Sequence, residues 1–184
     1  MFRIVSVEEN VKVHPSKFGK NIKKAIEESI NESIVDKIDK KFGVILSLIK
    51  INEIGEGKIY PADPHIYYRV IFDVLTYKPE INEIAYGEVI DNVRFGSFIR
   101  IVCFDSLVHI SQSMDDFVSF NEKTKTFDGK ETKRKLKIGD LVRARIISVS
   151  YEENNLKIGC TMRQPFLGTL EWIKEDRKKH AKKS

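Results

Sequence analysis

The first 80 residues show two kinds of hydrophobic repeat. Isoleucines recur every fourth position from Ile22 to Ile38, which predicts a helix of about four turns with one apolar stripe. Apolar runs before and after this helix predict three strands, at residues 2–13, 43–51 and 66–77. Because residues 43–51 are almost wholly apolar, we expect that strand to be central and buried on both faces.

From residue 81 the pattern changes to short strands with turn signals between them. Runs of alternating apolar and polar positions predict five strands, at residues 84–93, 98–104, 106–111, 140–151 and 155–162. We expect the polar stretch at residues 115–138 to be a solvated loop. The segment around Trp172 is expected to pack a short helix onto the strands.

These patterns predict an α+β protein with two domains. Residues 1–80 would form a β-α-β-β domain of the RNP-like type, which is a truncated ferredoxin-like fold. Residues 81–184 would form an all-β, five-stranded barrel of the oligonucleotide-binding (OB) type, followed by a basic tail. One helix can cover only one face of the N-terminal sheet, so we expect a partner to cover the other face.

Charge is unevenly distributed along the chain. The net charge is +5, but residues 81–173 hold 13 basic and 13 acidic residues, whereas residues 174–184 hold six and two. This tail could contact phosphates or remain solvated and disordered. No apolar run approaches the roughly 18 residues that span a bilayer, and Glu8 and Glu9 interrupt the start where a signal peptide would be apolar. We therefore expect a cytoplasmic protein without a membrane partner.

The sequence offers no arrangement typical of an active site. No nucleophile is placed beside a base, no glycine-rich phosphate loop is complete, and the histidines lack the spacing of a zinc site. Asp115 and Asp116 are expected to be solvated loop acids, and Cys103 and Cys160 to be buried free thiols. We therefore expect no catalysis by the chain alone, no cofactor and no bound metal.

Strand alternation assigns aromatic rings and cations to the outer face of the barrel. The outward positions are Phe98, Arg100, His109, Arg143, Arg145 and Lys157. Gly96 could bring Phe95 to the same side, either by a bulge or by a close approach of the backbone. Rings interleaved with cations suit single-stranded nucleic acid, because bases stack on rings and phosphates pair with Arg and Lys. Periodicity alone also allows both phenylalanines to lie in the barrel core.

The barrel region resembles the ribosomal S1 type of RNA-binding domain. The shared features follow in order: a glycine in the first strand, FG-x-F at residues 95–98, LVHIS at residues 107–111, GD before the fourth strand, and a closing LKIGCTM strand. In that family two aromatic residues and a histidine line the RNA face, which implies this role for Phe95, Phe98 and His109. Ser150 and Asn155 stand where the family has an aspartate and a basic residue.

Across its whole length the sequence resembles the E-prime stalk subunits of archaeal DNA-directed RNA polymerase, counterparts of the seventh subunit of eukaryotic RNA polymerase II. The motifs that carry this resemblance are FGK, GEG, YKPE, QSMDDFVSF and TMRQPFLGTLEWI, in the family's order. The resemblance implies a non-catalytic protein that forms a heterodimer with the small F subunit of RNA polymerase and docks on core RNA polymerase near the clamp. Its barrel would meet the emerging single-stranded nascent RNA, in support of initiation, elongation and termination.

The resemblance also implies that two N-terminal loops, near residues 15–20 and 55–65, dock on core polymerase, and their glycines and prolines would set the backbone shape there. Their candidate residues are Pro15, Phe18, Gly19, Lys20, Gly55, Gly57, Pro61 and Pro64. Two alternatives stay open. One is a free-standing RNA-binding translation or RNA-decay factor that uses the same barrel, and the other is a scaffold that makes no RNA contact because its barrel is neutral.

Overall fold

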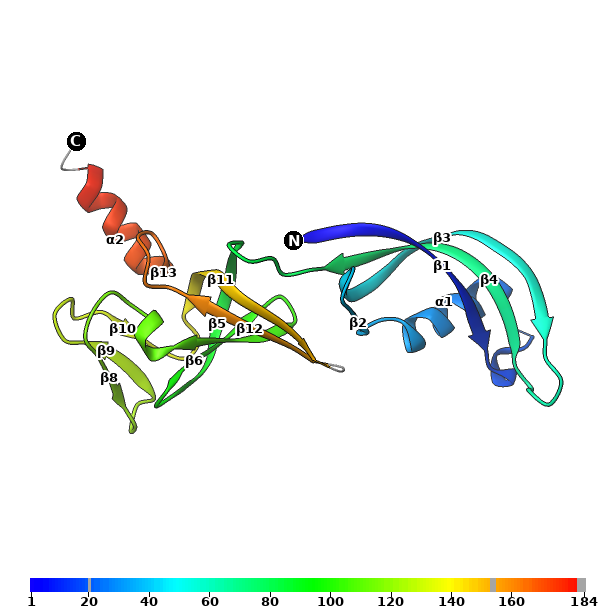
Figure 1. The fold of residues 1–184 in the computed structure, drawn as a ribbon, viewed down its shortest axis with the longest axis horizontal. Coiled ribbons are helices and arrows are strands. Elements are labelled where there is room, and N and C mark those ends of the chain that lie inside the picture. Colours follow the sequence, from blue (N-terminus) through cyan, green and yellow to red (C-terminus); the bar gives the residue numbers. More distant parts are fainter. Residues whose placement is uncertain (20, 153–154, 182–184) are drawn as a thin grey trace. The chain divides into compact units, whose positions relative to one another are not determined.

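The computed structural model describes residues 1–19, 21–152 and 155–181, and it divides into two compact units, Met1–Lys78 and Pro79–Ser184 (Figure 1). The division falls at the Lys78–Pro79 bond, and the residue before a proline is restricted to extended backbone. Among the described residues, no helix is long and apolar enough to cross a membrane.

In the described part of the first unit, antiparallel strands form one sheet, in the order β1 (Phe2–Val13), β4 (Ile66–Tyr77), β3 (Gly43–Ile59) and β2 (Ile38–Asp39). A 3₁₀ turn, η1 (Pro15–Lys17), leads into helix α1 (Ile22–Ser33). The Asn21 side chain caps this helix by accepting a hydrogen bond from the Lys23 backbone N–H at 3.0 Å. The helix packs on one face of the sheet around a buried core of valines, isoleucines and Phe72. The predicted β-α-β-β order is thus confirmed, with the short β2 added.

Helix α1 is shorter than the isoleucine repeat predicts. Ile34 is its C-cap, Asp36 adopts a left-handed φ of 66°, and Ile38 belongs to β2. Asp is one of the few residues other than glycine that tolerates this conformation, which reverses the chain. Ile26 and Ile30 are fully buried, whereas Ile22 is 55% exposed at the helix start. The four-residue spacing therefore continues beyond the helix itself.

Strand β3 is not buried on both faces, so that prediction was wrong. It pairs with β2 only through Gly43 and Val44, and beyond them it is an edge strand with Ile49 46% exposed. Its register with β4 shifts at four places, each leaving extra residues on β3. Because a bulge sets two residues against one, these shifts turn the usual two-residue repeat into a three-residue repeat. The residues packed against the core are Ile45, Leu48, Ile51 and Ile54.

Among the described residues of the second unit, five strands close into a barrel, as predicted. They are β5 (Ile84–Val93), β6 (Gly96–Ile101), β7 (Phe104–His109), β11 (Leu141–Glu152) and β12 (Asn155–Thr161). Strand β12 closes the barrel by pairing antiparallel with β11 and parallel with β7. A short strand, β13 (Gly168–Thr169), pairs antiparallel with the start of β11.

Strand alternation also predicts which residues face the barrel interior, and most of these positions are confirmed, although Ile110 is only half-buried. Ile99, Val108 and Val142 are fully buried. Cys160 is also buried, and desolvation raises the pKa of its thiol to about 12. Cys103 is exposed, contrary to prediction. Strand β6 ends at Ile101 and Val102 takes a left-handed φ of 58°, so the alternation stops before Cys103.

The stretch predicted as a solvated loop forms a small antiparallel sheet. Its strands are β8 (Val118–Asn121), β9 (Thr126–Gly129) and β10 (Lys135–Leu136), and a 3₁₀ turn, η2 (Ile110–Gln112), precedes them. Phe127 and Leu136 are fully buried beneath this sheet. We call residues 115–138 the insertion. The prediction of a solvated loop was therefore wrong for this stretch.

The C-terminal helix α2 (Leu170–Ala181) is longer than the short helix expected (Figure 1). Trp172 and Ile173 are buried and anchor its first turn, while Lys174, Arg177 and Lys178 are exposed. Much of the basic tail is therefore helical, and residues 182–184 lie outside the described part.

Candidate nucleic-acid interface and docking loops

The aromatic pair of the FG-x-F motif lies on the outer surface of the barrel. Phe95 sits in the turn between β5 and β6 and is 52% exposed, and Phe98 on β6 is half-buried. Their ring centroids are 6.2 Å apart with the planes at 86°, an edge-to-face arrangement. Because Phe95 is the more exposed of the two, its ring is the better candidate for stacking with a base.

Gly96 is explained by the close approach of strand β7. It pairs in register with Val93 and His109, and a Cβ added here would lie 2.4 Å from the Val108 carbonyl oxygen. The register of β5 with β6 shifts between Val89 and Asp91, away from this glycine. Of the two explanations that the sequence allows, close backbone approach therefore holds and a bulge at Gly96 does not.

His109 is the last residue of β7 and caps η2. Its Nδ1 accepts a hydrogen bond from the Ser111 backbone N–H at 3.3 Å and lies 2.8 Å from the Ser111 hydroxyl. In the neutral ring an accepting Nδ1 leaves the proton on Nε2, so His109 offers a donor from its exposed side. Because it pairs with Gly96, this donor lies beside the turn that carries Phe95.

Most predicted cations are already engaged within the chain. Arg100 donates to Asp105, with Nε 2.9 Å from Oδ1, and this hydrogen bond raises the pKa of Arg100. Lys157 lies 2.7 Å from Glu152 at the far end of the β11–β12 hairpin. Arg143 donates to the Phe166 carbonyl oxygen, with Nε at 3.0 Å. These pairs agree with the neutral charge of the barrel.

The structure groups only some of the predicted RNA-binding residues. Phe95, Phe98 and His109 lie near the turn between β5 and β6, whereas Arg100 pairs with Asp105, toward the other end of the β6–β7 pairing. Arg143 and Arg145 lie on β11, opposite Tyr86 and Ile84 of β5, so β5 separates them from the aromatic pair. The Arg145 Nε atom is buried without a hydrogen-bond partner among the described residues. The two arginines therefore belong to another part of the barrel surface.

Asn92, which the sequence reasoning missed, attaches the insertion to the aromatic hairpin. Its side-chain amide is buried and donates to the carbonyl oxygens of Lys125 and Leu136 at 2.9 and 3.3 Å. Its Oδ1 accepts from the Ser97 hydroxyl at 2.5 Å. The sequence did hold a signal for this attachment, because Asn92 and Ser97 are polar residues at inward positions on either side of the FG turn. Buried polar groups are almost always hydrogen-bonded, so each of them needs a partner.

The two candidate docking loops meet at one end of the N-terminal sheet. Ile66 pairs with Val13 on one side and with Ile59 on the other, and the rings of His14 and His65 are 5.2 Å apart. Around this end Pro15 opens η1, Phe18 is 45% exposed and Gly19 has a φ of +85°. Lys20 lies outside the described residues.

The second docking loop is shorter than the predicted residues 55–65. Gly55 and Gly57 belong to β3, and the turn itself, which contains Pro61 and Pro64, covers residues 60–65. A Cβ at Gly57 would lie 2.8 Å from the Tyr68 ring, so glycine allows β3 to cross this ring closely. Strand β3 therefore continues, with bulges, through the glycines that were predicted to begin the loop.

Asp63 organises that turn. It accepts hydrogen bonds from the Tyr67 hydroxyl at 2.6 Å and from the His65 backbone N–H at 3.0 Å, and it also contacts the His65 ring. The Tyr67 hydrogen bond is the largest of several that lower the pKa of Asp63. The turn at the end of the sheet is thus fixed by side-chain hydrogen bonds as well as by its prolines.

Comparison with known proteins assigns both units. Residues 8–64 match the SHS2 domain found in the N terminus of Rpb7p/Rpc25p/MJ0397, and residues 78–161 match the S1 RNA binding domain. The subunit Rpo7 of DNA-directed RNA polymerase from Sulfolobus acidocaldarius is 34% identical over 183 residues, 99% of this chain and 100% of the relative. The chain belongs to the Rpo7 family of DNA-directed RNA polymerase subunits.

The chain is also similar to a second archaeal Rpo7 subunit and to a eukaryotic polymerase subunit. Rpo7 of Saccharolobus shibatae is 33% identical over 97% of this chain, and subunit RPB7 of Saccharomyces cerevisiae RNA polymerase II is 22% identical over 92% of it. Both relatives are covered over 100% of their length. The resemblance to polymerase stalk subunits is therefore confirmed at the level of the family, with an RNP-like domain followed by an S1 barrel.

Proposed function

We propose that the chain is a non-catalytic stalk subunit of a cytoplasmic archaeal RNA polymerase. It pairs with the F subunit, docks on the core enzyme near the clamp by the loops around Phe18 and Pro61, and holds emerging single-stranded RNA on its barrel. In this role it supports initiation, elongation and termination. The observation that carries the proposal is the match of the whole chain to whole Rpo7 subunits, in both units.

The geometry of each unit supports its share of this role. The barrel carries an exposed aromatic pair with a histidine donor beside it, which suits bases stacked without regard to sequence. The first unit brings two loops together at one end of its sheet and fixes them with prolines, a glycine and the Asp63 hydrogen bonds. A docking element benefits from such rigidity, because less conformational freedom has to be given up on association.

Co-purification tests the proposal against a free-standing RNA-binding factor. The tagged chain is purified from its own cells after nuclease treatment, and the proteins that accompany it are identified. We expect core polymerase subunits and the F subunit in equal amounts. Ribosomes or nucleases in their place would overturn the proposal in favour of a translation or RNA-decay factor.

A matched pair of variants tests the docking loops. Phe18→Ala removes an exposed ring from the docking end, and Phe42→Ala removes one that precedes Gly43, at the opposite end of β3. We expect Phe18→Ala to lose core polymerase while keeping the F subunit, and Phe42→Ala to keep core polymerase. Equal retention of core enzyme by both variants would move the docking surface elsewhere.

A further inference from the structure

The insertion lies directly beside the aromatic pair. Asp91 on β5 pairs across the strands with Phe98, and its Oδ1 lies 3.0 Å from the Lys125 ammonium. Arg94, which precedes Phe95, forms an ion pair with Glu122. The turn between β8 and β9 is thus connected at two points to the hairpin that carries both rings. Across the surface of the barrel, the neighbouring elements are therefore β7, β6, β5 and then this turn.

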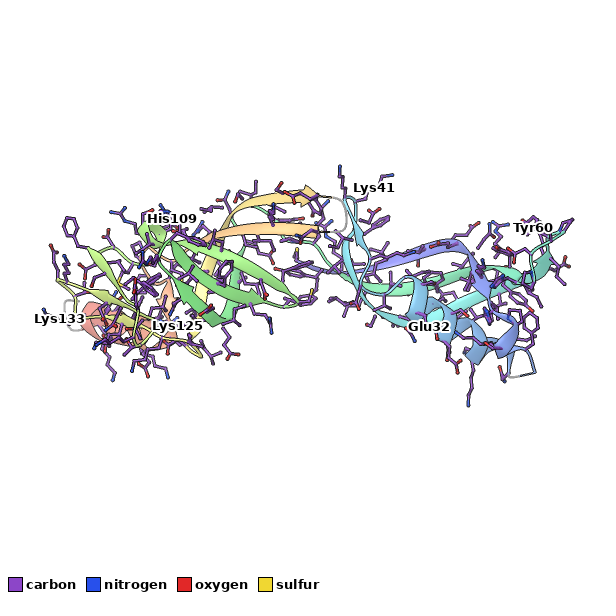
Figure 2. All side chains as sticks on the ribbon, turned by 90° about the horizontal axis from the view of Figure 1, so that it is seen from below. Glu32, Lys41, Tyr60, His109, Lys125 and Lys133 are labelled. Atoms are coloured by element: carbon purple, nitrogen blue, oxygen red, sulfur yellow. The ribbon has the colours of Figure 1, made fainter. Side chains whose placement is uncertain are left out.

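Figure 2 shows His109 and Lys125 at opposite edges of the second unit. A nucleic-acid strand that reached both residues would cross β6 and β5, and so would pass over Phe98 and Asp91. Neighbouring strands are about 4.8 Å apart, so this path is short on the scale of a few nucleotides. The aromatic surface therefore leads to the insertion.

A hollow of about 400 Å³ opens on the insertion, and its lining includes Thr124 and Thr126, the two neighbours of Lys125 in the sequence. Its lining combines cations, hydroxyl and amide groups, a carboxylate and one apolar side chain, from Asn121, Thr124, Thr126, Asp128, Lys135, Lys137 and Ile138. Lys135 and Lys137 are exposed on either side of the buried Leu136. Two ammonium groups beside hydroxyl donors form a suitable site for a phosphate of the strand.

Asp128, which lines the hollow, has a carboxylate oxygen without a hydrogen-bond donor among the described residues. Its Oδ1 atom is buried and makes no hydrogen bond within the described residues, with the Lys135 ammonium 3.7 Å away. A buried acceptor without a donor is costly, and such an atom calls for an explanation. Because this atom has almost no accessible surface, a ribose 2′-hydroxyl can supply the missing donor only when the Lys135 side chain moves aside. The 2′-hydroxyl distinguishes RNA from DNA.

We propose that RNA crossing the aromatic pair continues into this hollow, where Lys135 and Lys137 bind a phosphate and Asp128 accepts a hydrogen bond from a ribose hydroxyl. The inference rests on the proposed function, because it extends the same RNA path. It assigns two lysines of the insertion to the interface, although residues 81–173, which include the insertion, are neutral as a whole. It also gives a reason for preferring RNA over DNA.

The first test measures how salt affects the affinity of the full 184-residue chain for a single-stranded RNA of twelve uridines. The double substitution Lys135→Gln/Lys137→Gln should reduce the slope of log affinity against log salt by about 1.4, at about 0.7 for each phosphate that is no longer neutralised. The control Lys130→Gln/Lys133→Gln removes two exposed lysines of the same insertion that do not line the hollow. An equal reduction by the control would show a general effect of charge and overturn the assigned site.

The second test compares RNA with DNA of matched sequence. We expect the wild-type chain to prefer RNA, and Asp128→Ala to narrow that preference by about two- to tenfold, the worth of one hydrogen bond. An unchanged preference in Asp128→Ala would overturn the role of the ribose hydroxyl. Phe95→Ala/Phe98→Ala separates the two proposals. Loss of binding in this variant with no effect of the lysines rejects the hollow alone, whereas no RNA binding by the wild-type chain rejects the RNA role altogether.

Discussion

The two units solve the problem of burying a β-sheet in different ways. In the second unit the strands close on themselves, so the buried face is the barrel interior and the outer face is free for ligands. In the first unit α1 covers one face of an open sheet, and β3 remains an edge strand over most of its length. A closed barrel has no unpaired edge strand and needs no other element to cover one. An open sheet leaves the backbone of its edge strands and the side chains of its uncovered face available to other proteins.

This difference accounts for how each unit would serve a polymerase subunit. The outer barrel surface presents rings and a histidine on strands whose positions are fixed by pairing on both sides. The first unit presents an uncovered sheet face and a rigid end, which suit permanent association with protein. The comparison also makes separate predictions for stability, because each unit has its own core.

The largest effects are expected from cavities in the two cores. Ile30→Ala on α1 and Ile146→Ala on β11 each truncate a fully buried side chain and should lower the free energy of unfolding of their own unit by about 2–5 kcal/mol. Trp172, the one tryptophan in the sequence, lies in the second unit and reports its unfolding by fluorescence. Circular dichroism reports both units.

We therefore expect Ile146→Ala to move the fluorescence transition in denaturant, and Ile30→Ala to move only a part of the circular dichroism transition. If Ile30→Ala moved the Trp172 transition equally, the two units would unfold as one cooperative body. The two units would then differ in architecture but would not have separate free energies of unfolding.

The second prediction compares one glycine from each unit. Gly43 and Gly139 both have left-handed φ values, +84° and +86°. A Cβ at Gly43 would lie 2.2 Å from the Tyr77 carbonyl oxygen, whereas at Gly139 it would meet nothing within 4 Å. Gly139→Ala should cost about 1 kcal/mol of backbone strain, and Gly43→Ala about 3 kcal/mol, because strand β4 must also move.

Thermal unfolding of the two glycine variants measures this difference. The crowded position lies where β3 begins to pair with β4, so its displacement would disturb the register that sets the three-residue repeat. Equal melting temperatures for the two variants would contradict the close packing at this point of the sheet.

The sequence predicted the barrel better than the open sheet, and the reason is physical. Alternation in β6, β7 and β11 identified Ile99, Val108 and Val142 correctly, because regular pairing preserves the two-residue repeat. In β3 the repeated bulges replaced the two-residue repeat with a three-residue repeat, seen at Ile45 and Leu48. An apolar run that lacks the two-residue repeat looks like a strand buried on both faces, and this is why the burial of β3 was predicted wrongly. The three-residue spacing was nevertheless present in the sequence.

The candidate site was predictable only in part. Phe95, Phe98 and His109 lie together, as the motif implies, because a short hairpin fixes their relative positions. The hydrogen bonds of Asn92 with Lys125 and Leu136 link residues 33 and 44 positions apart, which no local pattern can show. Nor does alternation show that Arg100 and Arg143 are already hydrogen-bonded within the chain.

The third prediction compares exposed aromatic rings in the two units. Phe95 and Tyr60 are both 52% exposed, one on the barrel and the other at the docking end of the first unit. Phe95→Ala should weaken binding of single-stranded RNA by about 1–3 kcal/mol, the worth of one stacked base. Tyr60→Ala should leave RNA affinity unchanged, since its ring lies in the turn after β3, at the docking end of the first unit.

Fluorescence anisotropy with labelled RNA, on the full chain, measures both affinities. Melting curves for the two variants exclude a loss of folded protein as the cause. If Tyr60→Ala weakened RNA binding as much as Phe95→Ala, RNA contacts would lie on the first unit as well, and the two units would not differ in RNA binding.

The smallest effect is expected from Asp116, for which the sequence predicts only a solvated loop acid. It accepts hydrogen bonds from the Thr132 hydroxyl at 2.6 Å and from the backbone N–H groups of Glu131 and Thr132. These bonds, led by that of the Thr132 hydroxyl, lower the pKa of Asp116 from 3.8 to about 2. Because the folded pKa lies below the unfolded one, the stabilisation is complete above about pH 4 and is lost as the pH falls towards about 2.

Asp116→Asn should therefore flatten the fall in unfolding free energy of the second unit over this pH range, and should leave the first unit unaffected. Denaturant titrations followed by Trp172 fluorescence between about pH 4 and about pH 2 measure the slope. Asp115→Asn, which removes the same charge one position earlier, is the control. Identical slopes for the wild type and Asp116→Asn would show that the folded insertion does not depend on this carboxylate. Its order would then come from the buried Phe127 and Leu136 and from the Asn92 hydrogen bonds.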